Sequence, residues 1–163
     1  MRIAIVSDIH DRRDNFENLL TLIKNNAVDH LFLLGDFWAP STIIKGLLSL
    51  ALPTHIVRWN NDGEIQKTTM LCMQADNVFL SSKTYENIQL DGKNIVLAHY
   101  PDMVALVWDH VDAVFYWHIH QREKRIQGKT LIVNPWAVLG DRESASFAIW
   151  DTQSNDVEFV DVL

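Results

Sequence analysis

An aspartate and a histidine stand one residue apart near the start of the chain, at Asp8 and His10. They directly follow Ile3-Ala4-Ile5-Val6, an apolar run that is too short for a helix and rich in β-branched residues, so it predicts a buried strand. In an extended chain, side chains at this spacing point the same way, so the carboxylate and the imidazole could bind one metal ion together. The alternative is that Asp8 caps the next helix and His10 is an ordinary loop residue.

Polar side chains of the same kind recur after later apolar runs. The candidate ligands at expected strand ends are Asp8, His10, Asp36, Asn60, His99, His118 and His120. Mixed nitrogen and oxygen ligands suit Mn, Fe, Ni or Zn better than Ca or Mg. Seven candidates exceed the need of one tetrahedral ion, whereas two ions bridged by a shared carboxylate would use them all. The remaining histidines, His30, His55 and His110, are predicted to be solvated.

The elements that would position these ligands alternate in the first half of the chain. Apolar runs predict strands at residues 3–6, 31–34 and 54–58, and helical spacing predicts helices around 16–23, from 41 onward and at 64–75. This β-α-β-α-β-α order implies a parallel sheet with right-handed crossovers. Ligands in such sheets bind beyond the carboxyl ends of the strands, which is where Asp8, His10, Asp36 and Asn60 fall.

The second half of the chain is rich in strands. They are expected at residues 78–80, 84–90, 94–98, 113–116, 122–126, 130–133, 145–150 and 157–160, with a helix at about 102–108. Asp91-Gly92 and Gln127-Gly128-Lys129 are hairpin turn signals. Two sheets packed face to face, with helices outside, would account for this pattern.

Composition narrows the class of protein. The 163 residues are predicted to form one domain, residues 1–163, and the net charge of −7 argues against extended nucleic-acid binding. The single Cys72 excludes an internal disulfide framework and fits the reducing cytoplasm. No signal peptide or membrane-spanning run is expected.

The motifs taken together resemble a known family. Asp8-Ile9-His10, Gly35-Asp36, Asn60-Asn61-Asp62, His99 and His118-Ile119-His120 resemble the calcineurin-like metallophosphoesterase pattern of Asp-x-His, Gly-Asp, Gly-Asn-x-Asp/Glu, His-Gly and Gly-His-x-His. The similarity is to the small YfcE-like phosphodiesterases, and Asn134-Pro135 is similar to their Asn-Pro-Gly turn.

The resemblance implies an α/β fold, a four-layer αββα sandwich of two mixed β-sheets flanked by helices, and a dinuclear metal site. By this likeness Asp8, His10 and His120 would hold one ion, Asp36 would bridge, and the other ion's ligands would be Asn60, His99 and His118. The ions would be Mn, with Ni, Fe or Zn as alternatives, and a bridging hydroxide would attack a small or nucleotide-like phosphodiester. Asn60, Asn61 and Asp62 would lie beside the substrate.

Several residues depart from the family pattern. Asn61 stands where many members have a proton-donating His, and an amide cannot be a general acid. Tyr100 replaces the Gly beside the metal-binding His, and Trp59, Trp117 and Trp136 occupy three more glycine positions. One interpretation is a catalytically weak or inactive protein-binding scaffold, like the retromer subunit of this fold.

A second interpretation of the tryptophans concerns decoding. The chain has 6 Gly and 6 Trp, and its glycine content is about half of average usage. The source organism would read UGA as Gly, whereas this sequence has UGA translated as Trp. Ordinary divergence is the alternative, and UGA decoding does not account for Tyr100.

Overall fold

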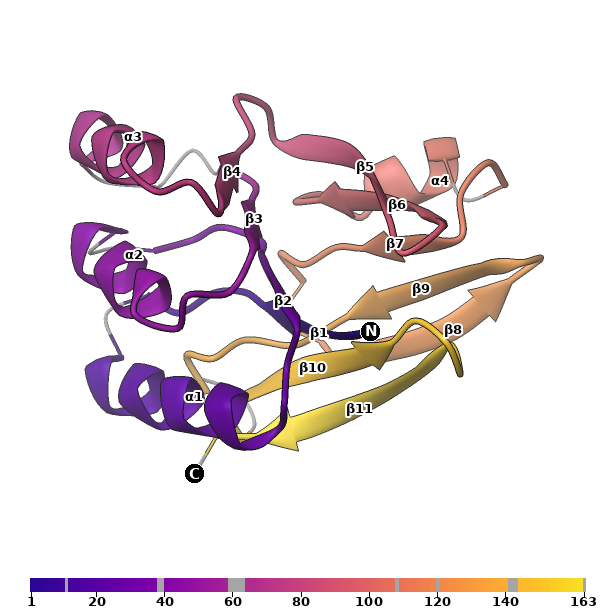
Figure 1. Ribbon diagram of the computed structural model, residues 1–163. Helices are drawn as coiled ribbons and strands as arrows, with labels where there is room; N and C mark the ends of the chain where they lie inside the picture. The colour runs from indigo at the N-terminus through magenta and orange to yellow at the C-terminus, as the bar shows by residue number, and fades with distance from the viewer. Residues whose placement is uncertain are drawn as a thin grey trace.

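Two β-sheets stacked face to face form the centre of the molecule (Figure 1). The computed structural model describes residues 1–10, 12–37, 40–58, 64–107, 109–119, 121–140 and 144–162. The first sheet has the order β11-β10-β1-β2-β3-β4 and the second has the order β5-β6-β7-β9-β8. The strands are β1 (Arg2–Val6), β2 (His30–Leu33), β3 (Thr54–Ile56), β4 (Val78–Leu80), β5 (Tyr85–Leu90), β6 (Lys93–Ala98), β7 (Ala113–Phe115), β8 (Glu123–Gln127), β9 (Thr130–Asn134), β10 (Ser146–Asp151) and β11 (Asp156–Asp161).

The first sheet begins with four parallel strands, as the alternating pattern predicts. β1, β2, β3 and β4 pair in parallel, and β10 then adds antiparallel to β1. The crossovers are α1 (Arg13–Asn25), α2 (Pro40–Leu48) and α3 (Ile65–Met73), which cover the outer face of this sheet (Figure 1). Phe16 and Leu19 of α1 pack in one buried cluster with Ala4 and Val6 of β1.

The space between the sheets is filled by the other side of the same strands. Ile3 and Ile5 of β1 join a buried cluster with Leu97 and Phe115 of the second sheet. Alternate residues of a strand face opposite sides, so β1 is apolar throughout because both of its faces are covered. Such a strand reads as a continuous apolar run.

The second sheet is mixed, and its outer face carries α4 (Asp102–Val107). β6, β7 and β9 run parallel, while β5 and β8 are antiparallel edges joined to them by the two predicted hairpins. Val104 of α4 packs with Val96, Val114 and Tyr116. The helix–sheet–sheet–helix order confirms the predicted four-layer sandwich of two mixed sheets.

Two of the three histidines that were predicted to be solvated are not. His30 is buried and His55 is largely covered, because both lie within strands on the side that faces the second sheet. Their rings stack at 5.2 Å, and the His55 ring stacks on Phe79 at 4.7 Å. The Nδ1 atom of His55 lies 3.5 Å from Oε2 of Glu86 on β5. The prediction was wrong because an alternating pattern does not reveal a polar ring between two sheets, whereas His110 is exposed as expected.

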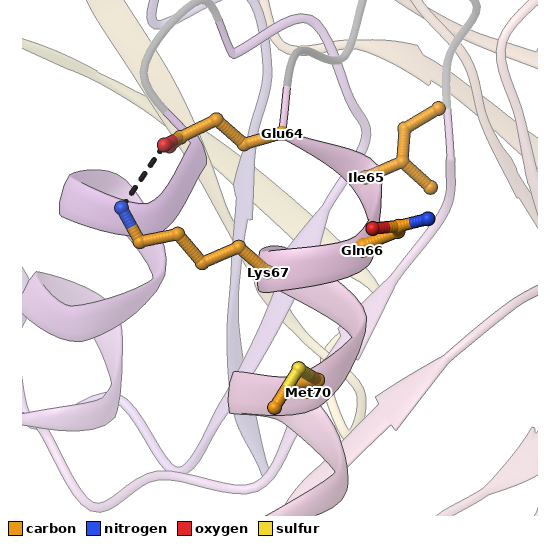
Figure 2. A pocket seen from close by; sticks show the side chains of 5 residues that line it. All are labelled: Glu64, Ile65, Gln66, Lys67 and Met70. Atoms are coloured by element: carbon orange, nitrogen blue, oxygen red, sulfur yellow. Dashed lines mark hydrogen bonds and ion pairs between the residues drawn. The ribbon is translucent and has the colours of Figure 1, made fainter.

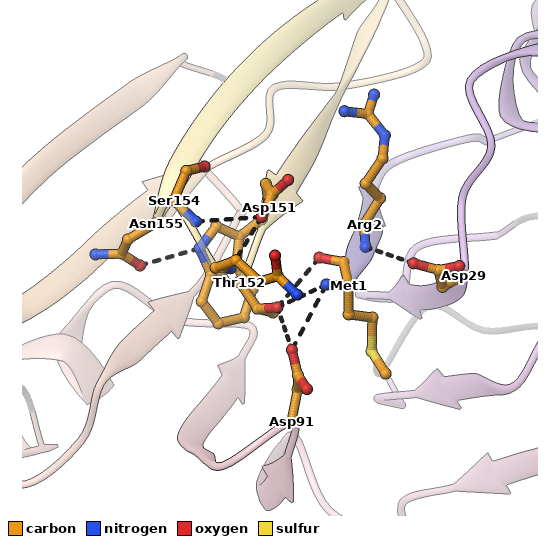
Figure 3. Close-up of polar contacts among 10 residues, drawn as sticks. Met1, Arg2, Asp29, Asp91, Asp151, Thr152, Ser154 and Asn155 are labelled. Atoms are coloured by element: carbon orange, nitrogen blue, oxygen red, sulfur yellow. Dashed lines mark hydrogen bonds and ion pairs between the residues drawn. The ribbon is translucent and has the colours of Figure 1, made fainter.

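Polar contacts join the sheets at the amino ends of the parallel strands (Figure 3). Thr152, in the turn after β10, donates from its hydroxyl to the carboxylate of Asp91, in the turn between β5 and β6. The Asp151 carboxylate caps the same turn by accepting from the backbone N–H of Gln153 at 2.9 Å. None of the described helices has the length and apolar character needed to cross a membrane.

Candidate metal centre

Three of the predicted ligands converge at the carboxyl ends of β1 and β2. Asp8, His10 and Asp36 each offer a ligand atom, and these atoms lie within 4.8 Å of one another. Nε2 of His10 lies 3.7 Å from Oδ2 of Asp36. Both carboxylates are buried, and a buried acid is costly without a cation or hydrogen bonds. We call these residues the aspartate–histidine triad.

The backbone of the triad is left-handed rather than extended. Asp8 and His10 both have φ of 49°, and Asp36 has φ of 64°. The backbone N–H of His10 donates to the carbonyl of Asp36 at 3.2 Å, which holds the two loops together. The expectation of an extended Asp8-Ile9-His10 segment is therefore wrong, although the two side chains do converge. Asp8 does not cap the next helix either, because α1 begins at Arg13 with Arg12 as its capping residue.

Two more predicted ligands form a pair at the carboxyl ends of strands in the second sheet. His99 follows β6 and His118 follows β7. Nε2 of His99 lies 3.0 Å from Nδ1 of His118, so one ring donates an N–H to the other. His99 is fully buried, and its burial, followed by the charge of His118, lowers its pKa to about 2. His99 is therefore a neutral imidazole, the form that binds metals. We call these two residues the histidine pair.

The loop after β9 connects the second sheet to the triad. The Ser7 hydroxyl donates to the carbonyl of Trp136 at 2.7 Å, and the N–H of Leu139 donates to the carbonyl of Asp8 at 2.9 Å. The carboxyl ends of β1 and β9 therefore meet at the same end of the sandwich. The histidine pair follows β6 and β7, which run parallel to β9, so it faces this end as well.

Side chains that sequence reasoning did not assign support this end of the molecule. Ser7 is buried and directly precedes Asp8. In the sequence, only this position beside the first motif indicates a role for it. The hydroxyl of Tyr116 donates to the carboxylate of Glu123, which spans the base of the loop that carries His118. Burial, followed by this bond and the charge of Glu123, raises the pKa of Tyr116 to a value well above its ordinary range.

Three of the residues that depart from the family pattern are described: Tyr100 and Trp117 lie beside the histidine pair, and Trp136 lies in the loop that bonds to Ser7. The Tyr100 ring lies 4.7 Å from the His99 ring and 5.3 Å from the His118 ring. Trp117 is fully buried, with its ring 4.2 Å from the His99 ring. Trp136 is buried too, and it has φ of 75°.

The remaining site predictions lie outside the described residues. They are Asn60, Asn61, Asp62 and His120, together with the substituted glycine position Trp59. An open hollow of about 590 Å³ begins just beyond the first of these segments and is lined by Glu64, Ile65, Gln66, Lys67 and Met70 (Figure 2). No predicted metal ligand lines this hollow in the described part of the chain. Lys67 pairs there with Glu64 at 3.0 Å.

The donor set fits divalent metal ions. The aspartate–histidine triad combines two buried carboxylates with an imidazole, and the histidine pair adds two ring nitrogens. Mixed nitrogen and oxygen donors of this kind suit first-row divalent metals. The excess of buried negative charge at the triad would be offset by such an ion.

Comparisons with known proteins identify the family and the fold. Residues 1–155 match the calcineurin-like phosphoesterase superfamily domain. A phosphodiesterase from Methanocaldococcus jannaschii is 24% identical over 146 residues, which cover 86% of each chain. A solved archaeal phosphodiesterase superposes with a TM-score of 0.89 at 21% identity over 99% of both chains. The phosphoesterase YfcE from E. coli superposes with a TM-score of 0.74 at 22% identity over both full chains.

Proposed function

The chain belongs to the calcineurin-like phosphoesterase superfamily, and from this premise we propose that it is a metal-dependent phosphodiesterase acting on a small or nucleotide-like phosphodiester. The observation that carries the proposal is the aspartate–histidine triad, whose ligand atoms lie within 4.8 Å of one another at buried strand ends. The similarity to a phosphodiesterase over most of both chains supports the same reaction class. Residues 1–163 would form one domain that works in the cytoplasm.

The proposed ligand assignment uses all seven candidates. Asp8, His10 and His120 would hold one ion, Asp36 would bridge, and the second ion would be held by Asn60, His99 and His118. Two divalent ions, Mn or alternatively Ni, Fe or Zn, would supply an activated water and neutralise the phosphate oxygens. The metal-binding His99 needs no deprotonation near neutral pH, because burial lowers its pKa to about 2.

The residues beside the substrate favour a diester with a good leaving group. Asn61 offers an amide, which cannot donate a proton as a general acid. The leaving oxygen would then depart as an anion or take its proton from water. An aryloxide departs readily as an anion when its P–O bond breaks, so an aryl phosphodiester is the appropriate assay substrate.

The test is metal analysis of the purified protein, followed by turnover of bis-p-nitrophenyl phosphate with added Mn²⁺. We expect up to two ions per chain and metal-dependent release of nitrophenol. Metal binding without turnover would favour the scaffold alternative, and absence of both would contradict the proposed centre.

The Asp36→Asn variant tests the bridging assignment. The bridging position needs the charge of the carboxylate to hold two cations together, so we expect loss of most bound metal and a fall in kcat of about 100-fold or more. Asp76→Asn is the matched control, because Asp76 is exposed. Unchanged metal content and turnover in Asp36→Asn would contradict the assignment.

A further inference from the structure

Each imidazole of the histidine pair is followed in the chain by an exposed apolar side chain. Tyr100 follows His99 and is 41% exposed, and Ile119 follows His118 and is 39% exposed. Both belong to the few large apolar side chains that are exposed among the described residues, and each adjoins an imidazole of the pair in the chain. The triad, by contrast, lies among buried side chains. Exposed apolar surface therefore adjoins the histidine pair, and the Tyr100 ring lies directly against both imidazoles.

The Tyr100 ring has a defined position on this rim. It meets the His99 ring edge-to-face, with the ring planes 89° apart, and the His118 ring at 69°. Its backbone is fixed as well, because the carbonyl of Tyr100 accepts from the N–H of Met103 in the first turn of α4 at 3.2 Å. A ring held by two neighbouring rings and a helix start is preorganised for binding, since little conformational freedom remains to be lost.

We infer that Tyr100 forms a seat for an aromatic ester arm, so that this residue selects phosphodiesters with an aryl or nucleobase-bearing arm. The inference rests on the proposed function, because it assumes that a phosphate binds beside the histidine pair. A phosphate placed there would put its ester arm within reach of the exposed part of Tyr100. Stacked or edge-to-face contact with an aromatic arm would then add to the affinity.

The experiment compares two ligands of the same charge that differ only in the arm. Binding of phenyl phosphate and of methyl phosphate to the Mn²⁺-loaded protein is measured by calorimetry, for the wild type, Tyr100→Leu and Tyr100→Phe. We expect the phenyl-to-methyl affinity ratio to fall about 3- to 10-fold in Tyr100→Leu, and to be kept in Tyr100→Phe. The affinity for methyl phosphate should stay within about 2-fold in both variants. Tyr85→Leu, on the outer face of the second sheet, is the matched control and should keep the ratio.

Three outcomes would overturn the inference. They are an equal ratio in the wild type and Tyr100→Leu, an equal loss of both ligands in Tyr100→Leu, and failure of either ligand to bind. The second outcome would mean that Tyr100 only holds the imidazoles in place. Turnover of the aryl diester separates the two proposals: turnover with an unchanged ratio rejects the aromatic seat alone, whereas a Tyr100-dependent ratio without turnover rejects the phosphodiesterase activity alone.

Discussion

At the scale of the residue, Trp136 holds a backbone conformation that does not suit its side chain. Its φ is 75°, which is a genuine outlier for a bulky residue. The side chain is only 3% exposed, and its Nε1 atom is buried without a hydrogen-bond partner among the described residues. The backbone, in contrast, is fully used, since the N–H of Trp136 donates to Asn134 at 3.0 Å and the carbonyl accepts from Ser7. The position uses the backbone that glycine adopts most readily.

Comparing glycine with alanine at position 136 separates this backbone effect from loss of the indole. Both Trp136→Gly and Trp136→Ala remove the buried ring, but only glycine adopts φ of 75° without strain. We expect Trp136→Gly to have the larger free energy of unfolding of the two, by about 1 kcal/mol. Urea denaturation of both variants measures the difference.

Trp150 supplies the control for this comparison. It lies within β10, where Gly should be less stable than Ala by about 0.5–1 kcal/mol. The same order of stability at both positions would contradict the argument.

The gene sequence tests the decoding hypothesis separately: UGG at codons 59, 117 and 136 would exclude UGA decoding. The backbone supports that hypothesis at position 136 and not at Trp117, which is absent from the described residues with positive φ.

At the scale of the element, the loop between β7 and β8 is closed at its base. Tyr116 is the first residue after β7 and Glu123 is the first residue of β8, and the bond between their side chains holds the two ends of the loop together. Arg125 pairs with Glu123 at 2.7 Å and keeps its carboxylate in place. His118 lies inside this loop with φ of 79°, a conformation that its neighbours must maintain.

Removing the Tyr116 hydroxyl should loosen this loop without unfolding the protein. For Tyr116→Phe we expect about 10-fold weaker Mn²⁺ binding, a magnitude typical of lost support behind a metal ligand. The free energy of unfolding should fall by about 1–2 kcal/mol. Titration calorimetry with Mn²⁺ and urea denaturation measure the two quantities, and Tyr85→Phe is the control. A stability loss with unchanged Mn²⁺ affinity would show that the bond supports the fold alone.

The sequence predicts the elements better than it predicts the conformation of their ends. The alternating order places Asp8 and Asp36 at neighbouring strand ends, because parallel strands bring their carboxyl ends to one edge. It does not reveal the left-handed backbone of Asp8 and His10, because positive φ is uncommon for any non-glycine residue, even though Asp and His adopt it more often than most. It also misses the bond from Tyr116 to Glu123, which depends on how β7, β9 and β8 are ordered in the sheet.

At the scale of the whole molecule, the two sheets hold a pair of stacked imidazoles between them. His30 and His55 come from the first sheet, and Glu86 of the second sheet lies 3.5 Å from His55. Burial, followed by the charge of His55, lowers the pKa of His30 to about 4. The folded protein therefore resists protonation of His30, whereas the unfolded chain takes up the proton near pH 6.5.

The sign of this effect predicts acid destabilisation. Above about pH 6.5 His30 is neutral in both the folded and the unfolded state, so it does not make the free energy of unfolding depend on pH. As the pH falls from about 6.5 to 4, the unfolded chain binds the proton first, and the free energy of unfolding should fall by about 3 kcal/mol through His30. His30→Leu should remove this part of the decline, while the exposed His110→Gln should keep it. The prediction would be contradicted if the free energy of unfolding fell by the same amount at acidic pH in the wild type and in His30→Leu.

The bond from Ser7 to Trp136 joins residues that are 129 apart in the sequence. On the ribosome, at 5–20 residues per second, the partner of Ser7 is added roughly 6–26 s after Ser7 itself. β1 also cannot pair with its antiparallel neighbour β10 until that strand is synthesised, which happens later still. Until then the nascent chain displays an uncovered edge of β1 beside Asp8, a surface that chaperones recognise. The support of the triad is thus completed only near the end of translation, and if the proposed centre binds metal, we expect the metal to be acquired after synthesis rather than during it.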